Sequence, residues 1–155
     1  MNINILAVGT RMPGWVNEGV SEYTRRTPPD WRIEFHEVAL AKRGKSGSAE
    51  RWKDQEAEAL LARVKSQDFT VALDVMGKQL DTGQLATSLE RIRGDGHRLN
   101  LLIGGPDGLG RACLQQADAT WSLSALTLPH PIVRVIVAEQ LYRAISILGG
   151  HPYHR

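Results

Sequence analysis

The sequence predicts an α/β fold, a three-layer sandwich around a mostly parallel sheet. Short apolar runs alternate along the whole chain with stretches in which apolar residues recur at helical spacing. Glycine-containing turns close several of the apolar runs, as expected where strands end. A chain in which strand and helix take turns in this way favours a parallel sheet with helices on both faces.

The first half of the chain provides three predicted strands and two helices. Pro13 suits the first turn of a helix, where its missing N–H needs no partner, and Ser48 is a suitable helix cap. In the second strand Ile33, Phe35 and Val38 are expected to face the core. The predicted elements are strand 3–8, helix 13–26, strand 31–40, helix 48 to about 65, and strand 69–73, closed by a turn at 74–78.

The second half continues the alternation and ends in a long apolar helix. That helix stops at Gly149-Gly150, where glycine makes further helix costly. Apolar residues occur on more than one face of this helix. One face is therefore expected to pack on the sheet, and another is available to contact a second subunit. The predicted elements are helix 82–93, strand 99–103, a short helix at 111–117, strand 120–123 and helix 132–148.

Composition indicates an ordinary globular protein. With 155 residues, 42% hydrophobic and 23% charged, the chain is expected to form one domain, residues 1–155. A single cysteine, Cys113, fits a reducing compartment, and neither a leader nor a membrane-spanning segment is apparent, so we expect a cytoplasmic protein without a membrane partner. The net charge of +2 does not identify a nucleic-acid binder.

One basic loop is a candidate for contact with phosphate. Lys42, Arg43 and Lys45 lie together in a glycine-containing segment. A solubilising surface explains them equally well, so both interpretations stay open at this point.

The predicted ligand site lies where neighbouring strands end. In parallel sheets ligands gather at the carboxyl ends of strands, here Leu73-Asp74, Gly104-Gly105 and Leu123-Ser124. Paired glycines allow backbone to approach backbone, or backbone to approach a ligand. The apolar, hydroxyl-bearing loop that follows Ser122 would supply a second wall. Together they predict a pocket for a flat, partly polar small molecule.

Several other chemistries lack their required residues. A P-loop is suggested by Gly44-Lys45-Ser46, but the position that needs the first glycine holds Ala39. The histidines have neither cysteines nor paired carboxylates near them, so no metal site is expected. Ser122 and Ser124 lack a G-x-S-x-G context and an obvious base.

Motifs in the second half, with the opening strand, carry a resemblance over essentially the whole chain. The chain resembles the SPOUT class of methyltransferases and, within it, the ribosomal RNA large-subunit methyltransferase H family, which methylates N3 of a pseudouridine in 23S ribosomal RNA. The matching segments are Ile5–Gly9, the strand end at Leu73-Asp74, Leu101–Gly108, Leu123–His130, Arg134, Glu139–Ala144 and Tyr153-His154.

The resemblance implies a C-terminal trefoil knot, S-adenosylmethionine as cofactor, and a homodimer with the active site near its interface. The implied cofactor-binding residues are Leu73, Gly104, Leu123, Ser124, Ala125, Leu126, Thr127 and Leu128. In the implied reaction His130 or His154 accepts a proton, Arg143 stabilises negative charge and Tyr153 holds the base.

Three functions are therefore in competition. The resemblance favours the methyltransferase, acting on a folded target such as an assembled ribosomal particle, because a chain of this size carries no added RNA-binding module. A P-loop phosphotransferase and a non-catalytic ribosome-binding module are the alternatives. The C-terminal segment 151–155 is either a frayed end or, as the resemblance favours, part of the active site.

Overall fold

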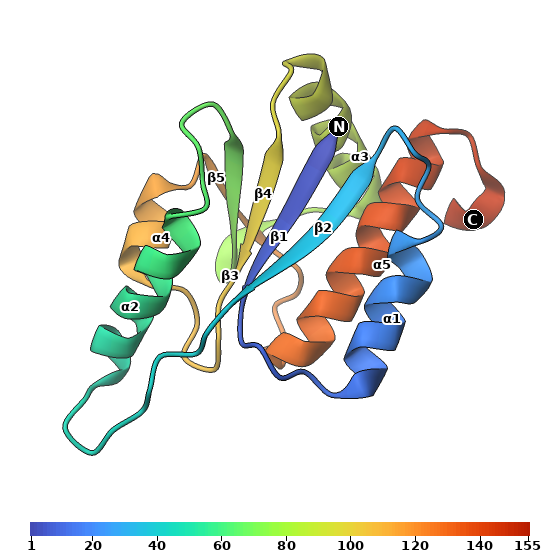
Figure 1. The fold of residues 1–155 in the computed structure, drawn as a ribbon. Coiled ribbons are helices and arrows are strands. Elements are labelled where there is room, and N and C mark those ends of the chain that lie inside the picture. The colour runs from blue at the N-terminus through green and yellow to red at the C-terminus, as the bar shows by residue number, and fades with distance from the viewer.

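The computed structural model describes residues 1–155 and contains one five-stranded sheet with the strand order β2-β1-β4-β3-β5 (Figure 1). Every neighbouring pair of strands is parallel. The elements are β1 (Asn2–Val8), α1 (Gly14–Thr24), β2 (Arg32–Val38), α2 (Ala49–Leu61), β3 (Phe69–Gln79), α3 (Thr82–Gly94), β4 (Leu99–Ile103), α4 (Arg111–Gln116), β5 (Ala119–Ser122), α5 (His130–Leu148) and a 3₁₀ turn, η1 (Pro152–His154).

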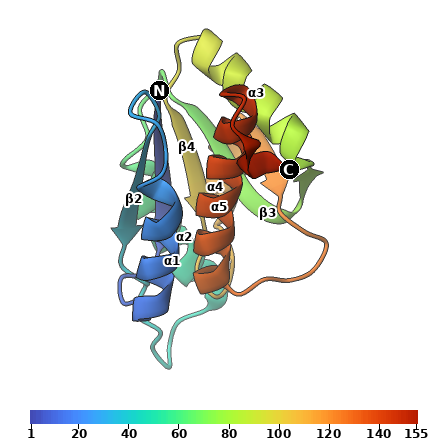
Figure 2. The same ribbon diagram turned by 90° about the vertical axis from the view of Figure 1, so that its right-hand side faces the viewer.

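Helices cover both faces of this sheet. Helices α1, α3 and α5 lie on one side, and α2 and α4 lie on the other (Figures 1 and 2). Residues of β1 alternate between the two layers, as the two-residue period of a strand requires: Ile3 and Ile5 pack towards α3 and α5, whereas Leu6 and Val8 pack towards α2 and α4. The predicted three-layer α/β architecture is confirmed.

The main departure from the predicted elements is at β3. The segment 74–78, expected to be a turn, continues the strand, which runs to Gln79. Its pairing with β5 is interrupted between Leu73 and Lys78 by a bulge and then resumes. At Gly77 an added Cβ would lie 2.7 Å from the carbonyl carbon of Trp121. The two backbones therefore approach too closely for any other residue, and pairing with β5 overrides the local turn signal.

Smaller differences concern ends and faces. Helix α2 begins after Ser48, whose Oγ accepts a hydrogen bond from the N–H of Arg51 at 3.3 Å, but it ends at Leu61 rather than near 65. Val38 is buried as expected, although it packs in the α2 layer, opposite to Ile33 and Phe35. None of the helices combines the length and apolar character needed to cross a membrane.

A polar network closes the amino-terminal edge of the sheet. It consists of Asn4, Asp68, Arg98 and Asn100, and we call it the amino-edge network. Arg98 donates to both carboxylate oxygens of Asp68, from Nε at 3.1 Å and Nη2 at 2.7 Å. Asn100 donates to Asp68 at 2.8 Å and accepts from Asn4 at 3.0 Å.

The pKa of Asp68 is set by this environment. Burial alone would raise the pKa of the carboxyl, but hydrogen bonds from Arg98, the backbone N–H of Lys65 and Asn100 lower it below its ordinary value. The amino-edge network therefore holds Asp68 ionised and fixes the starts of β3 and β4 together.

Candidate active site

A cavity of about 840 Å³ opens at the carboxyl ends of β4 and β5, beside the bulged middle of β3. Three segments form its walls: the bulged part of β3 with Leu73 and Asp74, the turn from Gly104 to Leu109, and residues 122–131. The volume is that of a small-molecule site, and the position is the usual one for ligands of parallel α/β proteins.

The first wall is the turn Gly104–Leu109, which we call the pocket turn. It is closed by a hydrogen bond from the N–H of Gly108 to the carbonyl of Gly105, at 3.0 Å. Gly108 has a φ of +85°, in the left-handed region. A Cβ at Gly104 would lie 2.5 Å from the carbonyl carbon of Gly108. Gly104 thus allows the backbone to fold back on backbone, and a side chain there would force the pocket turn open.

The second wall is the 123–129 loop, which has no regular secondary structure. Two hydroxyl groups shape its start: Ser122 Oγ donates to the carbonyl of Ser124 at 2.9 Å, and Ser124 Oγ accepts from the N–H of Leu126 at 3.0 Å. The main-chain N–H groups of Thr127 and Leu128 have no hydrogen-bond partner in the chain. These two donors are available to a polar ligand.

His130 stands where the 123–129 loop enters α5. Its Nδ1 is buried and has no hydrogen-bond partner. Burial lowers the pKa of His130, and the nearby positive charge of Arg134 lowers it further, while Glu56 acts in the opposite direction. The imidazole is therefore neutral near pH 7, which is the state that accepts a proton.

Arg134, one turn further along α5, ties the helix to the end of β1. Its guanidinium is 3% exposed, donates to the carbonyls of Val8 at 3.1 Å and Gly9 at 2.7 Å, and pairs with Glu37. Because these bonds satisfy most of a buried charge, Arg134 acts as an anchor for the helix that carries His130.

A separate cluster at the far end of α5 joins the C-terminal tail to the helix. Glu139 accepts from Nε of Arg143 at 2.8 Å and from the hydroxyl of Tyr153 at 3.0 Å. The Arg143 guanidinium lies 4.8 Å from the centre of the Tyr153 ring, and the Tyr142 ring is 4.6 Å away on centroids. Burial, with the hydrogen bond to Glu139, raises the pKa of Tyr153 to about 12. The tail is thus packed on α5, with Tyr153 uncharged at neutral pH.

The predicted site residues therefore fall into two groups. One group lines the cavity: Leu73, Gly104, Leu123, Ser124, Leu126, Thr127, Leu128 and His130. Ala125 belongs to the same loop but does not line the cavity. Arg143, Tyr153 and His154 also lie outside it.

The second group is distant from the cavity in the same chain. Arg143 is 13 residues beyond His130 on α5, which corresponds to about 20 Å at a rise of about 1.5 Å per residue. One copy of the chain does not bring the two groups together.

Sequence reasoning did not assign some residues of the cavity. Asp74 and Asp107 both line it and supply its carboxylates. Asp74 follows a predicted strand end and Asp107 lies in the G-G-P-D-G turn. Their positions next to predicted strand ends could have identified them as residues of the site. Asp74 has no basic partner in the chain; its carboxylate accepts the N–H of Met76 at 2.9 Å.

The basic loop proves to be divided. Arg43 is paired with Glu56 and Asp107, whereas Lys42 and Lys45 are exposed and form no ion pair. Of the three residues considered for contact with phosphate, only the two lysines have a free charge.

A parallel α/β sheet with a cavity between a glycine turn and a loop with free donors is typical of α/β proteins that bind a small molecule. The family described as predicted SPOUT methyltransferase matches residues 1–154. The chain belongs to the SPOUT methyltransferase family.

Individual relatives agree with this assignment. The "Ribosomal RNA large subunit methyltransferase H" of Marinomonas sp. (strain MWYL1) is 47% identical over 155 residues, covering 100% of both chains. Among solved structures, a probable methyltransferase from Bordetella pertussis Tohama I superimposes with a TM-score of 0.55 at 15% identity, over 93% of this chain and 96% of that one. A methylase family protein from Neisseria gonorrhoeae gives 0.51 at 11% identity, over 91% and 81%. These two structures show similarity of fold.

Proposed function

We propose that this protein is an S-adenosylmethionine-dependent methyltransferase that methylates N3 of a pseudouridine in 23S ribosomal RNA. The observation that carries the proposal is 47% identity over the full length to a relative named as a ribosomal RNA large-subunit methyltransferase. The active form is a homodimer of single-domain chains, residues 1–155, with a C-terminal trefoil knot. It works in the cytoplasm on an assembled ribosomal particle, and naked RNA is a poor substrate.

The cavity suits S-adenosylmethionine in size and chemistry. Leu73, Leu126 and Leu128 offer apolar walls for an adenine ring, and the free N–H groups of Thr127 and Leu128 match its hydrogen-bonding edge. The unpaired carboxylate of Asp74 suits the positive charge of this cofactor. When bound, the cofactor supplies a methyl group already activated by the adjacent sulfonium.

The role of the chain is to align the target base and to remove its N3 proton. His130 is the proposed proton acceptor, because the residue lines the cavity and its lowered pKa keeps the ring neutral. Arg143 would stabilise the negative charge left on the base, and Tyr153 would hold the base by stacking. His154, the alternative acceptor, lies in the tail beside Tyr153.

A homodimer resolves the separation between His130 and the Arg143–Tyr153 cluster. In the proposed dimer the tail of the partner subunit completes each cavity. Apolar surface for such a contact is present on the two adjacent helices: Trp15 of α1 is 54% exposed and Ile132 of α5 is 41% exposed. Large exposed apolar side chains on neighbouring helices are typical of surfaces that bind a partner.

The cofactor assignment is tested by calorimetry with S-adenosylmethionine. We expect the wild type to bind, and Gly104→Val to bind at least about 100-fold more weakly because the pocket turn is forced open. Gly94→Ala is the matched control, since a Cβ there meets nothing within 4 Å. A wild type that does not bind, or a Gly104→Val variant that binds normally, would contradict the assignment.

The shared site is tested by mixing two inactive proteins. His130→Gln and Tyr153→Ala dimers are allowed to exchange subunits and are then assayed on large-subunit particles. If each site uses one residue from each chain, half of the dimers are mixed and hold one intact site, so activity returns to about a quarter of wild type. No recovery after demonstrated exchange means that both residues act within one chain.

A further inference from the structure

A buried carboxylate lies directly beneath the pocket turn. Glu56, on α2, has a side chain that is 2% exposed. A Cβ built on Gly105 would be 3.6 Å from Oε1 of Glu56, so this carboxylate supports the first residues of the turn. An ionised group at such depth requires a cationic partner.

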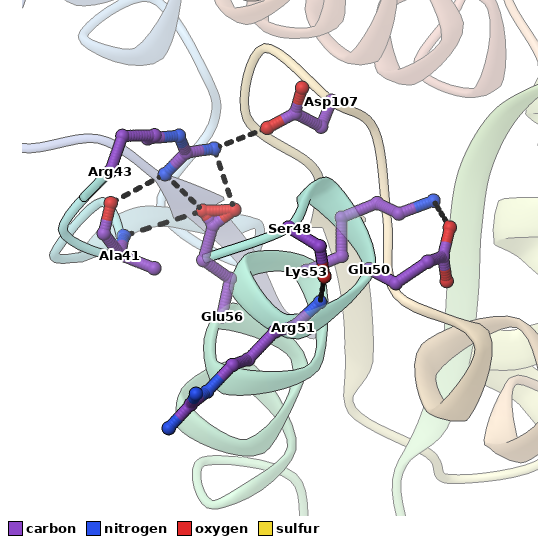
Figure 3. Close-up of polar contacts among 8 residues, drawn as sticks. All are labelled: Ala41, Arg43, Ser48, Glu50, Arg51, Lys53, Glu56 and Asp107. Atoms are coloured by element: carbon purple, nitrogen blue, oxygen red, sulfur yellow. Dashed lines mark hydrogen bonds and ion pairs between the residues drawn. The ribbon is translucent and has the colours of Figure 1, made fainter. Parts of the chain in front are cut away.

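Arg43 is that partner, and it reaches the pocket turn at the same time (Figure 3). Its Nη1 and Nη2 donate to the two oxygens of Glu56 at 3.2 and 3.4 Å, and Nη2 also donates to Asp107 Oδ2 at 2.7 Å. Nη1 makes a further bond to the carbonyl of Ala41, at 2.6 Å. One guanidinium therefore connects the basic loop, α2 and the pocket turn.

The side chain of Arg43 is held in place independently of Asp107. Its guanidinium lies 5.3 Å from the centre of the Trp52 ring, and the N–H of Ala41 donates to Glu56 at 3.4 Å. The guanidinium makes four hydrogen bonds to three groups, those of Ala41, Glu56 and Asp107. This needs the fixed planar geometry of arginine, which a lysine ammonium cannot reproduce.

Asp107 transmits this anchor to the cavity. It lies at the tip of the pocket turn and lines the cavity. Within the turn the closing hydrogen bond joins Gly105 and Gly108, which fixes its internal shape but not its tilt over the sheet. The ion pair from Arg43 to Asp107 spans 64 residues of sequence and ties the tip of the turn to the basic loop and α2.

We propose that Arg43, through Glu56 and Asp107, is a positioning residue that holds the pocket turn in the conformation that binds the methyl donor. This role rests on the proposed function and separates Arg43 from Lys42 and Lys45 in the same loop. Arg43 acts on cofactor affinity, and the chemical step is left to His130, Arg143 and Tyr153.

Asp107→Asn is the most direct test, because it removes the tether while leaving the buried Arg43–Glu56 pair intact. We expect the Kd for S-adenosylmethionine to rise about 10-fold, the effect of losing one charge-assisted hydrogen bond that is partly exposed. The value of kcat at saturating cofactor should stay within about twofold of wild type. The tether contributes equally to the bound ground state and to the transition state, so its loss weakens binding without slowing the chemical step.

Further variants separate positioning from a general loss of structure. Asp107→Glu keeps the carboxylate and should recover most of the affinity, whereas Arg43→Lys, which keeps a charge on the buried Glu56, should behave like Asp107→Asn. Lys45→Gln is the matched control in the same loop and should leave the Kd unchanged.

The outcomes distinguish this inference from the proposed function. An Asp107→Asn Kd within twofold of wild type, or an equal rise in Lys45→Gln, would overturn the positioning role while leaving the methyltransferase assignment untouched. A wild type that binds no S-adenosylmethionine would overturn both. A 10-fold rise that Asp107→Glu reverses supports the inference.

Discussion

The amino ends and the carboxyl ends of the strands, here called the amino edge and the carboxyl edge of the sheet, differ in how their polar groups are bonded. At the amino edge Asn4, Asp68, Arg98 and Asn100 satisfy one another. Of the three buried side-chain polar atoms without a partner, Nδ1 of His130 and Nε of Arg134 are at the carboxyl edge, and Oγ1 of Thr70 is in β3 beside Asn100. The carboxyl edge also holds the cavity and the free N–H groups of Thr127 and Leu128, so it is suited to bind a ligand, whereas the amino-edge network holds the strand starts together.

The largest effect is expected from His130→Gln at the carboxyl edge. Loss of a general base lowers kcat by about 10²- to 10⁴-fold, while the melting temperature and the cofactor Kd should change little. Because the pKa of His130 is lowered from 6.5, wild-type kcat should hold constant through that pH and fall only as the pH drops further. Stopped turnover assays on large-subunit particles measure both effects.

His97→Gln serves as the control from the amino edge, where the half-buried His97 contacts the carbonyl of Gln67. It should leave kcat and its pH dependence unchanged. A His130→Gln variant that retains a third or more of wild-type kcat would remove His130 as the base and leave His154.

A smaller effect, on stability instead of activity, is expected from Asp68→Asn at the amino edge. The Asp68 side chain is only 2% exposed, and the substitution removes the charge that Arg98 pairs with. Breaking a buried charge pair lowers the free energy of unfolding by about 3 kcal/mol. Denaturant titration measures the loss. The Kd for S-adenosylmethionine at the opposite edge should stay within twofold, and a larger change would show that the two edges are coupled.

The pH dependence of stability sharpens the same test. The pKa of Asp68 is lower in the folded protein than its ordinary value of 3.8. Its contribution is therefore present above about pH 4 and is lost as the pH falls through the folded pKa. Wild type should lose its stability advantage over Asp68→Asn in that acid range, and a difference independent of pH would contradict an ionic origin.

The contrast between edges also explains what sequence could predict. Strand β4 was predicted with its observed bounds because a continuous apolar run ends at a glycine pair, which is a local signal. The extension of β3 was missed because its partner, β5, lies more than 40 residues away and pairing is non-local. Local patterns placed the ends of β4 and β5, and hence two walls of the cavity, whereas Leu73 and Asp74 lie at a bulge within β3.

Specific partnerships at the site were beyond sequence patterns for the same reason. Nothing local links Arg43 to Asp107, 64 residues later. Sequence patterns placed the 123–129 loop at the pocket, but the roles of its individual residues and of the tail came from family resemblance. Resemblance identifies functional positions and does not say which chain supplies them. Arg143 and His130 are far apart in one chain, so the proposed active site requires the homodimer to bring them together.

The smallest effect is expected from Lys42→Gln combined with Lys45→Gln, outside the cavity. Each lysine is exposed and without an ion pair, so each is free to contact a phosphate of the substrate. Losing two such contacts should reduce the slope of log Kobs against log salt by about 1.4 for single-stranded RNA. Binding to large-subunit particles over a range of KCl concentrations measures this slope.

The matched control removes two charges from the segment that follows α2, Arg63→Gln with Lys65→Gln, both exposed. If the slope falls equally in the control, the effect is one of net charge and the loop is only a solubilising surface. If it falls in the loop variant alone while the Kd for S-adenosylmethionine stays constant, the basic loop has two functions. Its lysines then contact RNA, and its arginine holds the wall of the cofactor cavity, so substrate and cofactor meet on one short segment.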